Sequence, residues 1–423
     1  MERTTCCVTG GGPAGMILGL LLARAGIDVT VLEKHADFLR DFRGDTVHAS
    51  TLTLLDELGL GGGFDKLPHR MLEQLQVQLD QGVVPIADLR RLPGPHKHIA
   101  LVPQWDLLGM LADAAAAEPT FRLRMNTEVT GLRRRGATVT GVTYRTADGT
   151  TGELAADLVV AADGRSSTVR AAAGLRSREF GVPMDVWWFR LPRHEDDPEG
   201  GLGRFGSGRR PEGGAGQSDT AGRGVVLIDR GDYFQCAFLI RKGQDPVLRA
   251  EGIESLHKQL VELVPWLADR AATVTSWDDV KLLTVKLNRL RRWFGPGVLC
   301  IGDAAHAMSP VAGVGINLAV QDAVAAATIL AGPLRRGAPS RWRLARVQAR
   351  RWLPTAVTQG VQRVIHKALL GRALSGGLSP TGTGAAPPRL VRLLLRFPRL
   401  RAVPAYFIAI GVRPEHAPQP ARR

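Results

Sequence analysis

Cysteine is scarce in this sequence, with four residues in 423. So few cysteines cannot build a disulfide framework in a chain of this length. Cys6 and Cys7 are adjacent in an apolar run with the pattern of a β-strand, so they would point to opposite faces and cannot form a Cys-x-x-Cys redox pair. Cys236 and Cys300 also lie in apolar, strand-like runs. We therefore expect four reduced core cysteines and a cytoplasmic protein.

Acidic residues are also in short supply, with 40 Asp and Glu against 55 Lys and Arg, which gives a net charge of +15. Such an excess attracts anions: cofactor phosphates, nucleic acids or membrane surfaces. The basic residues are scattered, and no aromatic-interleaved groove or nucleic-acid motif accompanies them. This distribution favours a solvated basic surface and argues against a nucleic-acid partner. We also find no signal peptide and no apolar segment of membrane-spanning length, and we expect no metal site.

A glycine-rich turn near the N-terminus follows an apolar strand expected over residues 5–9 and opens a helix expected over 14–25. Glycines at this spacing allow a tight turn, close approach of a pyrophosphate and close helix packing, while the helix N-terminus attracts phosphate. Glu33, followed by Lys34, ends a second strand over 29–32, where a carboxylate binds the adenosine ribose. The motif predicts a dinucleotide without separating NAD from FAD. The expected contacts in the turn are Gly10, Gly12, Pro13, Ala14 and Gly15.

A second motif, Asp163-Gly164, ends an apolar strand in the middle of the chain and leads into a helix. The acidic side chain and the glycine turn could contact a cofactor. Arg165 and Arg170 follow and could offer charge to the phosphates of a nicotinamide cofactor. An ordinary helix cap with surface arginines explains the same residues, so both interpretations stay open.

The third motif, Gly302-Asp303, follows another buried strand. A carboxylate in that place can bind polyol hydroxyls, such as those of a ribityl chain. The glycine-rich turn after it lets backbone amides approach a ring, and the helix that begins near Ile316 directs its positive end at that ring. In this order, the three motifs indicate FAD. The expected contacts are Gly302, Asp303, Pro310, Gly313, Gly315, Ile316 and Asn317.

With these three motifs, residues 4–350 resemble the class A flavoprotein monooxygenases, the para-hydroxybenzoate hydroxylase-like family of single-component FAD hydroxylases. The resemblance implies FAD as cofactor, NADH or NADPH as reductant, and O2 delivered through a flavin C4a-hydroperoxide. It also implicates Arg43 after the second strand, Gln104 at the start of a helix, and the backbone around Val129 beside the adenine.

The resemblance further implies an α/β fold, in which a Rossmann-like FAD-binding domain carries an inserted substrate domain with a mixed or antiparallel sheet. A helical tail completes the chain. The FAD-binding domain is expected over residues 1–75, 98–175 and 280–353, the substrate domain over 76–97 and 176–279, and the C-terminal helical segment over 354–423.

The substrate implied by the resemblance is a small aromatic or polycyclic, polyketide-like molecule that is hydroxylated or epoxidised. Candidates for a catalytic base or relay are His48, Arg190, Tyr233 and His306. Each has a simpler explanation. His48 would lie on a helix surface, Arg190 on a strand surface and Tyr233 in a hairpin, while His306 would pack beside the glycine-rich turn of the third motif. The aromatic run 187–189 would line the substrate pocket or pack in a core.

Other functions on the same scaffold are a flavin-dependent reductase, a halogenase, or a flavin-binding sensor without turnover. Against a halogenase, no Trp-x-Trp-x-Ile run is present, and Trp187-Trp188 does not match it. The glycine-rich stretch 195–224 is interpreted as a mobile surface loop rather than a lid. The basic tail over 388–412 is expected to pack on the body rather than contact a membrane. No feature indicates an oligomeric state.

Overall fold

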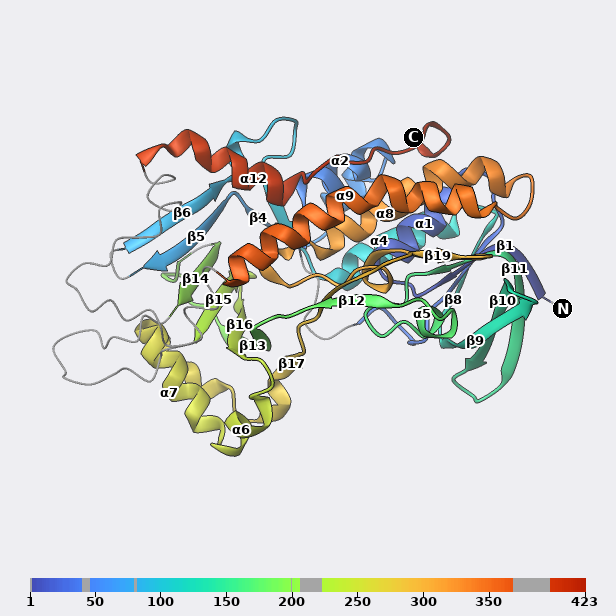
Figure 1. The fold of residues 1–423 in the computed structure, drawn as a ribbon. Helices are drawn as coiled ribbons and strands as arrows, with labels where there is room; N and C mark the ends of the chain where they lie inside the picture. Colours follow the sequence, from blue (N-terminus) through green and yellow to red (C-terminus); the bar gives the residue numbers. More distant parts are fainter. Residues whose placement is uncertain (1, 40–45, 80–81, 199, 206–222, 368–395) are drawn as a thin grey trace.

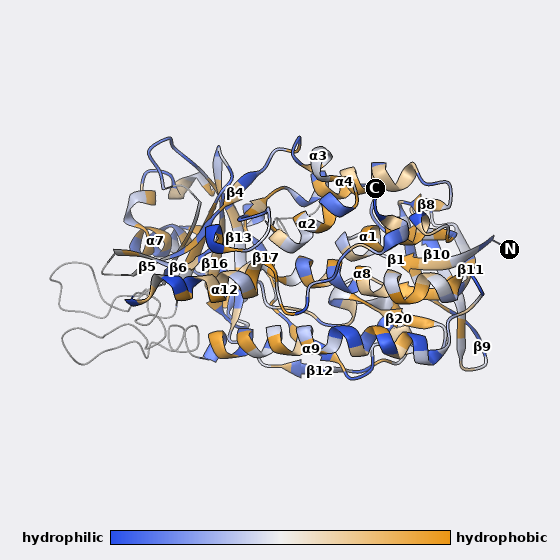
Figure 2. Ribbon diagram, turned by 90° about the horizontal axis from the view of Figure 1, so that it is seen from above, coloured by the Kyte–Doolittle hydropathy of each residue, from blue (hydrophilic) through white to orange (hydrophobic). Residues whose placement is uncertain are grey.

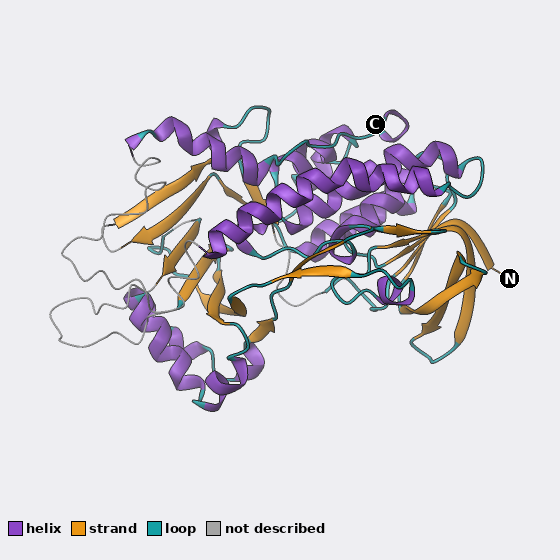
Figure 3. Ribbon diagram, in the orientation of Figure 1, coloured by secondary structure: helices purple, strands orange, loops and turns teal. Residues whose placement is uncertain are grey.

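Two sheets stand at opposite ends of an elongated molecule, with the long helices α8 (Gly315–Leu334) and α9 (Arg341–Ile365) running between them (Figures 1 and 3). This computed structural model describes residues 2–39, 46–79, 82–198, 200–205, 223–367 and 396–423. The N-terminal strands lie in one sheet, and the middle of the chain supplies most of the other (Figure 1).

The first sheet is the one that the N-terminal sequence predicts. Its strands, in spatial order, are β19 (Phe294–Gly295), β20 (Val298–Cys300), β11 (Thr151–Ala161), β1 (Glu2–Thr9), β2 (Val29–Leu32) and β8 (Phe121–Arg124). Apart from β19, neighbouring strands are parallel, and β10 (Thr138–Thr146) and β9 (Thr127–Arg135) extend β11 as an antiparallel hairpin. Parallel strands buried on both faces carry continuous apolar runs, which explains the sequence around Cys6 and Cys7.

Different elements pack on the two faces of this sheet. Cys6 packs with α1 (Pro13–Arg24), α4 (Gln104–Ala116) and α8, whereas Cys7 packs with β9 and β10 on the other side. All four cysteines are buried and free, and burial raises the pKa of Cys7 to about 12. The expectation of four reduced core cysteines is therefore confirmed.

The second sheet has seven strands: β17 (Lys281–Leu283), β13 (Met184–Pro192), β16 (Tyr233–Arg241), β15 (Gly224–Asp229), β14 (Gly201–Phe205), β5 (Gln74–Leu79) and β6 (Gly82–Asp88). It is antiparallel except where β14 meets β5. One face is covered by α7 (Ile253–Leu263), with Trp187 and Phe189 in the core between them. The mixed sheet of the expected fold is thus present.

Shorter elements join the two sheets. The chain passes from the first sheet to the second through β12 (Ser177–Phe180), and it returns through β18 (Leu287–Leu290), which pairs with β12. A separate three-stranded sheet is made of β3 (Thr46–Val47), β7 (Ile99–Leu101) and β4 (Arg70–Leu72). The other α-helices in the described part of the chain are α2 (Ala49–Glu57), α3 (Gly61–Phe64), α5 (Thr168–Ala172), α6 (Asp245–Ala250) and α12 (Ala402–Ala409).

One local expectation is wrong in part. Residues 201–205 of the expected loop form β14, because pairing with both β5 and β15 outweighs the low strand preference of glycine; residues 206–222 lie outside the described part. The chain over 281–290 forms two strands, β17 and β18, which belong to different sheets. Helix α2 begins after His48, and the Ser50 hydroxyl donates to Asn317 Oδ1.

The helices α8 and α9 also depart from expectation. By length and composition, residues 311–334 could cross a membrane, contrary to the sequence-based expectation, but α8 packs in the core against α1 and α9. The expected boundary at residue 354 falls inside α9, which continues through Pro354. Proline removes one helical hydrogen bond, and the burial of Pro354 shows that tertiary packing offsets this local cost.

A buried carboxylate on α8 holds three parts of the chain together: α8 itself, the third motif and α9. Asp322 is fully buried and accepts hydrogen bonds from the backbone N–H of Gly302 (3.1 Å), from His306 Nε2 (2.6 Å) and from Arg351 Nε (3.0 Å). Burial alone would raise the pKa of Asp322, but the charges and hydrogen bonds of His306 and Arg351 outweigh it and hold that pKa below its ordinary value.

The same network reaches the C-terminal segment. Arg351, itself fully buried, also donates to Glu415 Oε1 at 3.3 Å, and its neighbour Arg350 bonds both oxygens of Glu415. Further along, Glu57 accepts from His416 and from the backbone of Ala417. The end of the chain therefore packs on the first sheet's helices, as expected for the tail, and α12 buries Ala405 and Ala409 against the body.

The adjacent residues Arg350 and Arg351 allow a controlled test of this network. Replacing Arg351 by Met leaves the buried Asp322 without its arginine, so we expect a loss of about 3–5 kcal/mol in unfolding free energy. The matched Arg350→Met loses a half-exposed pair with the same Glu415 and should cost about 1 kcal/mol or less. Urea denaturation of the flavin-loaded protein measures both. Equal losses would contradict the central place of Asp322.

Candidate functional site

The first glycine motif forms a turn that only glycine can make. Gly10 has φ +99°, and a Cβ there would lie 2.6 Å from the carbonyl oxygen of Ala162. A Cβ on Gly15 would lie 2.0 Å from the carbonyl oxygen of Gly10. At Gly12, in contrast, a Cβ would meet no described atom within 4 Å. Two glycines thus permit close packing, and the third faces open space where a pyrophosphate can approach.

The N-terminus of α1 has uncapped backbone amides that can bind an anion. Its N-cap residue is Gly12, and no described side chain caps the first turn, so the amides there stay available to a phosphate. Glu33 lies beside this turn, where its carboxylate accepts from the backbone N–H of Gly11 (2.8 Å) and of His35 (3.0 Å). Glu33 is 5% exposed, so it orders the turn in addition to its expected ribose contact. Lys34 is exposed.

The second motif packs on the first and third. The carboxylate of Asp163 accepts from the backbone N–H of Val169 through Oδ2, while its buried Oδ1 has no partner in the described structure. Burial raises the pKa of Asp163 despite these hydrogen bonds. Arg170 donates to the carbonyl oxygens of Ala304 and Arg165. Arg170 therefore joins the second motif to the third, in place of its suggested contact with nicotinamide phosphates.

The third motif places a carboxylate at the same edge. Gly302, at φ +55°, sits between α1 and α8, where a Cβ would lie 3.1 Å from Ala319 Cβ. Asp303 follows in a short 3-10 turn, and its side chain is one-third exposed. Arg165 Nε donates to its Oδ2 at 3.3 Å. The carboxylate therefore stays accessible to a polyol while an arginine holds its orientation.

The turn between Pro310 and α8, which we call the flavin turn, has a strained backbone. Ala312 and Gly313 both have positive φ angles, +67° and +63°, and a non-glycine residue in that region is uncommon. Helix α8 then begins at Gly315, and Ile316 lies in its first turn. Asn317 Oδ1 accepts from Ser50 and Thr51 of α2, which fixes the start of α8 against α2. Backbone strain at a functional site is expected where a turn must approach a ligand closely.

The three motifs meet because they follow adjacent parallel strands. In the sheet the order is β20, β11, β1 and β2, and the carboxyl ends of these strands carry Asp303, Asp163, Gly10 and Glu33, respectively. Ligands of open parallel sheets bind at this edge. The open space at Gly12, the accessible Asp303 and the unpartnered oxygen of Asp163 fit the phosphate and ribityl groups of FAD. These features define a flavoprotein with a second, mostly antiparallel sheet.

The other expected cofactor residues are placed as follows. Gln104 is the first residue of α4, and Val129 lies in β9 with its side chain buried. Arg43 lies outside the described residues. In the described part of the chain, no three His, Cys, Asp or Glu side chains gather as metal ligands would.

The two histidines among the catalytic candidates are buried. His48 is fully buried, not on a helix surface, and its ring nitrogens lie 2.8 Å from the carbonyl oxygen of Ile408 and 3.1 Å from that of Gly313. Burial lowers the pKa of His48 despite these contacts. His306 is bound to Asp322 and packs on Trp293 with ring centroids 4.9 Å apart. His48 therefore contacts the turn between Pro310 and α8, whereas His306 joins the third motif to Asp322 of α8.

The other two candidates lie in the second sheet. Arg190 and Tyr233 stack on one another, with the guanidinium carbon 4.7 Å from the ring centroid. Arg190 is exposed and Tyr233 half-buried. The structure thus brings these two together, but it places neither beside the histidines.

Sequence analysis missed a set of residues on the face of the second sheet that is turned away from α7. Here Trp188, Val226, Ala237 and Leu239 form a cluster against which Val311 of the flavin turn packs. We call these five residues together with Gln235 the substrate face. Gln235 belongs to it because side chains two residues apart in a strand share a face. The available signal was Gln235 itself, a polar residue in the otherwise apolar run 234–240 of β16.

Comparisons with known proteins agree with this geometry. A family described as "FAD binding domain" matches residues 3–361. A relative named 6-methylpretetramide 4-monooxygenase, from Streptomyces rimosus, is 33% identical over 404 residues, covering 95% of this chain and 91% of the relative.

Two solved structures share the fold. The anhydrotetracycline hydroxylase OxyS from Streptomyces rimosus has a TM-score of 0.73 at 24% identity, over 99% of this chain and 78% of that one. PqsL from Pseudomonas aeruginosa, solved with 2-aminobenzoylacetate, has a TM-score of 0.73 at 22% identity, over 89% of this chain and 99% of that one.

The chain belongs to the FAD-binding-domain family, as the motifs predicted. It is an FAD-dependent monooxygenase of the class A type, and the sequence-based assignment of cofactor and enzyme class is confirmed.

The role of Asp303 in holding the cofactor can be tested directly. Asp303→Ala removes an accessible carboxylate whose hydrogen bond to a ribityl hydroxyl is worth about 1.5–3 kcal/mol, so the Kd for FAD should rise about 10- to 100-fold. Flavin content after gel filtration and titration of the apoprotein measure the change. The matched Asp157→Ala, which removes a partly buried carboxylate within β11 that pairs with Arg3 of β1, should keep its FAD. A full flavin complement in Asp303→Ala would contradict the assignment.

Proposed function

We propose that this enzyme hydroxylates an aromatic, polycyclic substrate of the polyketide type, with NADH or NADPH as reductant and O2 as co-substrate. The similarity to 6-methylpretetramide 4-monooxygenase over 95% of the chain supports a substrate of this chemical class. The observation that carries the proposal is the substrate face itself, a mostly apolar group of residues in which Val311 of the flavin turn packs on the second sheet.

The polar groups on the substrate face match a flat molecule with oxygen substituents. Gln235 is 1% exposed, yet neither its amide oxygen nor its amide nitrogen has a hydrogen-bond partner among the described residues. Trp188 Nε1 is likewise buried and lacks a described partner. Buried polar atoms without partners are costly, so their presence here is explained by a ligand that satisfies them. A phenol or carbonyl oxygen accepts from both N–H donors, and a phenolic O–H donates to the Gln235 oxygen.

The residues around the flavin turn would bind and orient the two reactants. FAD, when bound, takes electrons from the nicotinamide cofactor and activates O2 for transfer to the substrate. The N-terminus of α8 favours negative charge at the ring. Val311 and Ala237 exclude water between the ring and the sheet, while Gln235 and Trp188 hold the substrate in one orientation. The buried free cysteines support a reducing, cytoplasmic location.

The visible spectrum under anaerobic conditions tests the proposal first. A flavin spectrum that NADPH or NADH bleaches in the presence of a phenolic polyketide, and that air restores, is the expected result. The product should contain one added oxygen atom by mass spectrometry. A halogenated or hydrogenated product would favour the alternative reactions, and a flavin that no nicotinamide cofactor reduces would favour a sensor.

Replacing Gln235 by an apolar residue should weaken substrate binding but increase the stability of the protein. Gln235→Leu removes unpartnered buried polar atoms, so the melting temperature should rise, while KM for the substrate should increase about tenfold. The control Gln259→Leu replaces a buried glutamine on α7, across the sheet, and should leave KM unchanged. Steady-state kinetics and thermal unfolding measure the two effects. Unchanged KM in Gln235→Leu would remove Gln235 from the substrate site.

A further inference from the structure

Three arginines from three elements surround one aromatic ring on the strands that join the two sheets. The guanidinium carbons of Arg178, Arg289 and Arg363 lie 5.4, 5.8 and 5.0 Å from the ring centroid of Phe180. Arg178 lies in β12, Arg289 in β18, and Arg363 near the end of α9. We call these three residues the arginine cluster.

The backbone register forces two of these charges together. Arg178 and Arg289 are directly opposite one another in the β12–β18 ladder. Like charges in that position destabilise a sheet. Burial, and then the charges of Arg178 and Arg363, lower the pKa of Arg289. The cluster therefore concentrates positive charge where the protein's own interactions oppose it.

No carboxylate compensates this charge in the part of the chain that the structure describes. None of the three guanidiniums forms an ion pair with a described Asp or Glu, and Arg289 Nη1 is buried without a hydrogen-bond partner there. Glu179, which directly follows Arg178, accepts hydrogen bonds from Asn288 and Ser177 instead. The sequence contains no Asp or Glu between Asp322 and Glu415, so α9 supplies only positive charge. Figure 2 shows hydrophilic residues along the length of α9.

Stacking explains part of the arrangement but not all of it. Arginine attracts aromatic faces, and Arg289 also lies 4.9 Å from the ring centroid of Trp352, which is 43% exposed. These contacts hold the guanidiniums in place without using their N–H donors. Arginines that are fixed in position, with donors left free, are arranged as in sites that bind phosphate.

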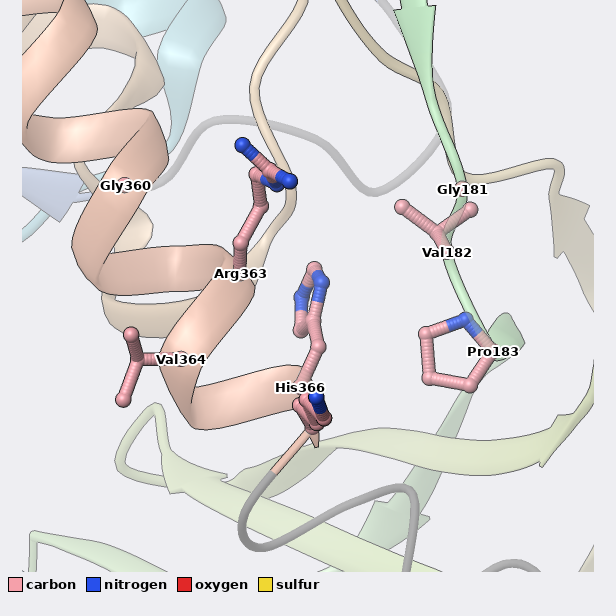
Figure 4. A pocket seen from close by; sticks show the side chains of 8 residues that line it. Gly181, Val182, Pro183, Gly360, Arg363, Val364 and His366 are labelled. Atoms are coloured by element: carbon pink, nitrogen blue, oxygen red, sulfur yellow. The ribbon is translucent and has the colours of Figure 1, made fainter.

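The cluster adjoins a pocket next to the flavin turn. Arg363 and His366 extend from α9 towards Val182 and Pro183 across a pocket of about 670 Å³ (Figure 4). His366 Nε2 lies 2.9 Å from Ser309 Oγ, immediately before Pro310 of the flavin turn. On the other side, the backbone N–H of Leu290 in β18 donates to the carbonyl oxygen of Ala305, two residues after Asp303. A ligand held by the cluster thus lies close to the flavin site.

We propose that the arginine cluster binds the phosphate groups of the nicotinamide dinucleotide reductant. This inference rests on the proposed use of NADH or NADPH, for which no other phosphate site is evident in the described residues. Arg165 and Arg170 are both engaged between the second and third motifs, so they are not available for this role. The exposed ring of Trp352 offers a stacking surface for the adenine of the same molecule.

Binding of ADP-ribose to the FAD-loaded enzyme tests the proposal without any redox reaction. ADP-ribose carries the phosphates of the reductant but no nicotinamide, and bound FAD blocks the flavin site. By calorimetry, Arg178→Gln and Arg289→Gln should each raise the Kd about tenfold. The control Arg346→Gln removes the same charge from an exposed position of α9 and should stay within about twofold. Melting temperatures of the two cluster variants should not fall, because a like-charge contact is removed.

Anaerobic reduction separates this proposal from the proposed function. The Kd for NADPH or NADH in flavin reduction should rise in the cluster variants, whereas reduction by reduced nicotinamide mononucleotide, which lacks the adenylate half, should be unchanged. Unaltered ADP-ribose binding in both variants would overturn the site, as would a wild-type enzyme that the dinucleotide reduces but that binds no ADP-ribose. If the wild-type enzyme binds ADP-ribose, the variants lose this binding, and neither NADH nor NADPH reduces the flavin, the arginine cluster is supported as a phosphate site. The same result would contradict the proposed reductant.

Discussion

The buried carboxylate of Asp322 is the constraint on which the arrangement of this molecule depends. A charge with no exposure to water is tolerated only when several donors surround it, and Asp322 has three: the backbone of Gly302, His306 and Arg351. These donors come from the third flavin motif and from α9. Because Arg351 also bonds Glu415, the end of the chain is tied to the turn that must hold the flavin. Geometry at the cofactor edge therefore depends on residues more than a hundred positions away in sequence.

The cofactor edge could be predicted because its determinants are local. Each motif is a strand followed at once by a turn, and the positions of Gly10, Asp163 and Asp303 follow from that pattern and from parallel pairing alone. The substrate face could not be predicted in the same way. Gln235, Trp188 and Val311 come from three separate segments, and only the sheet register and the packing of the flavin turn place them opposite one another. His48 was assigned to a surface because its two carbonyl partners, Ile408 and Gly313, are remote in sequence.

Local preferences also failed where tertiary contacts outweighed them. Glycines in 201–205 suggested a loop, yet two flanking strands complete the ladder there. A segment boundary was expected at 354, yet α9 continues through Pro354 because both α8 and the Asp322 network hold it in place. In each case a cost of about one to a few kcal/mol in local propensity is offset by burial that no short window of sequence reveals.

The arginines of this protein therefore fall into two groups. Arg351 and Arg170 are satisfied inside the fold, and their removal would expose carboxylates or carbonyl groups that they bond. Arg178, Arg289 and Arg363 are held by aromatic stacking and by strand register, with their charge uncompensated by any described carboxylate. A protein selected for stability alone would separate such charges or pair them. The same reasoning applies to the amide of Gln235: polar groups left unsatisfied by the fold mark the surfaces where small molecules complete it.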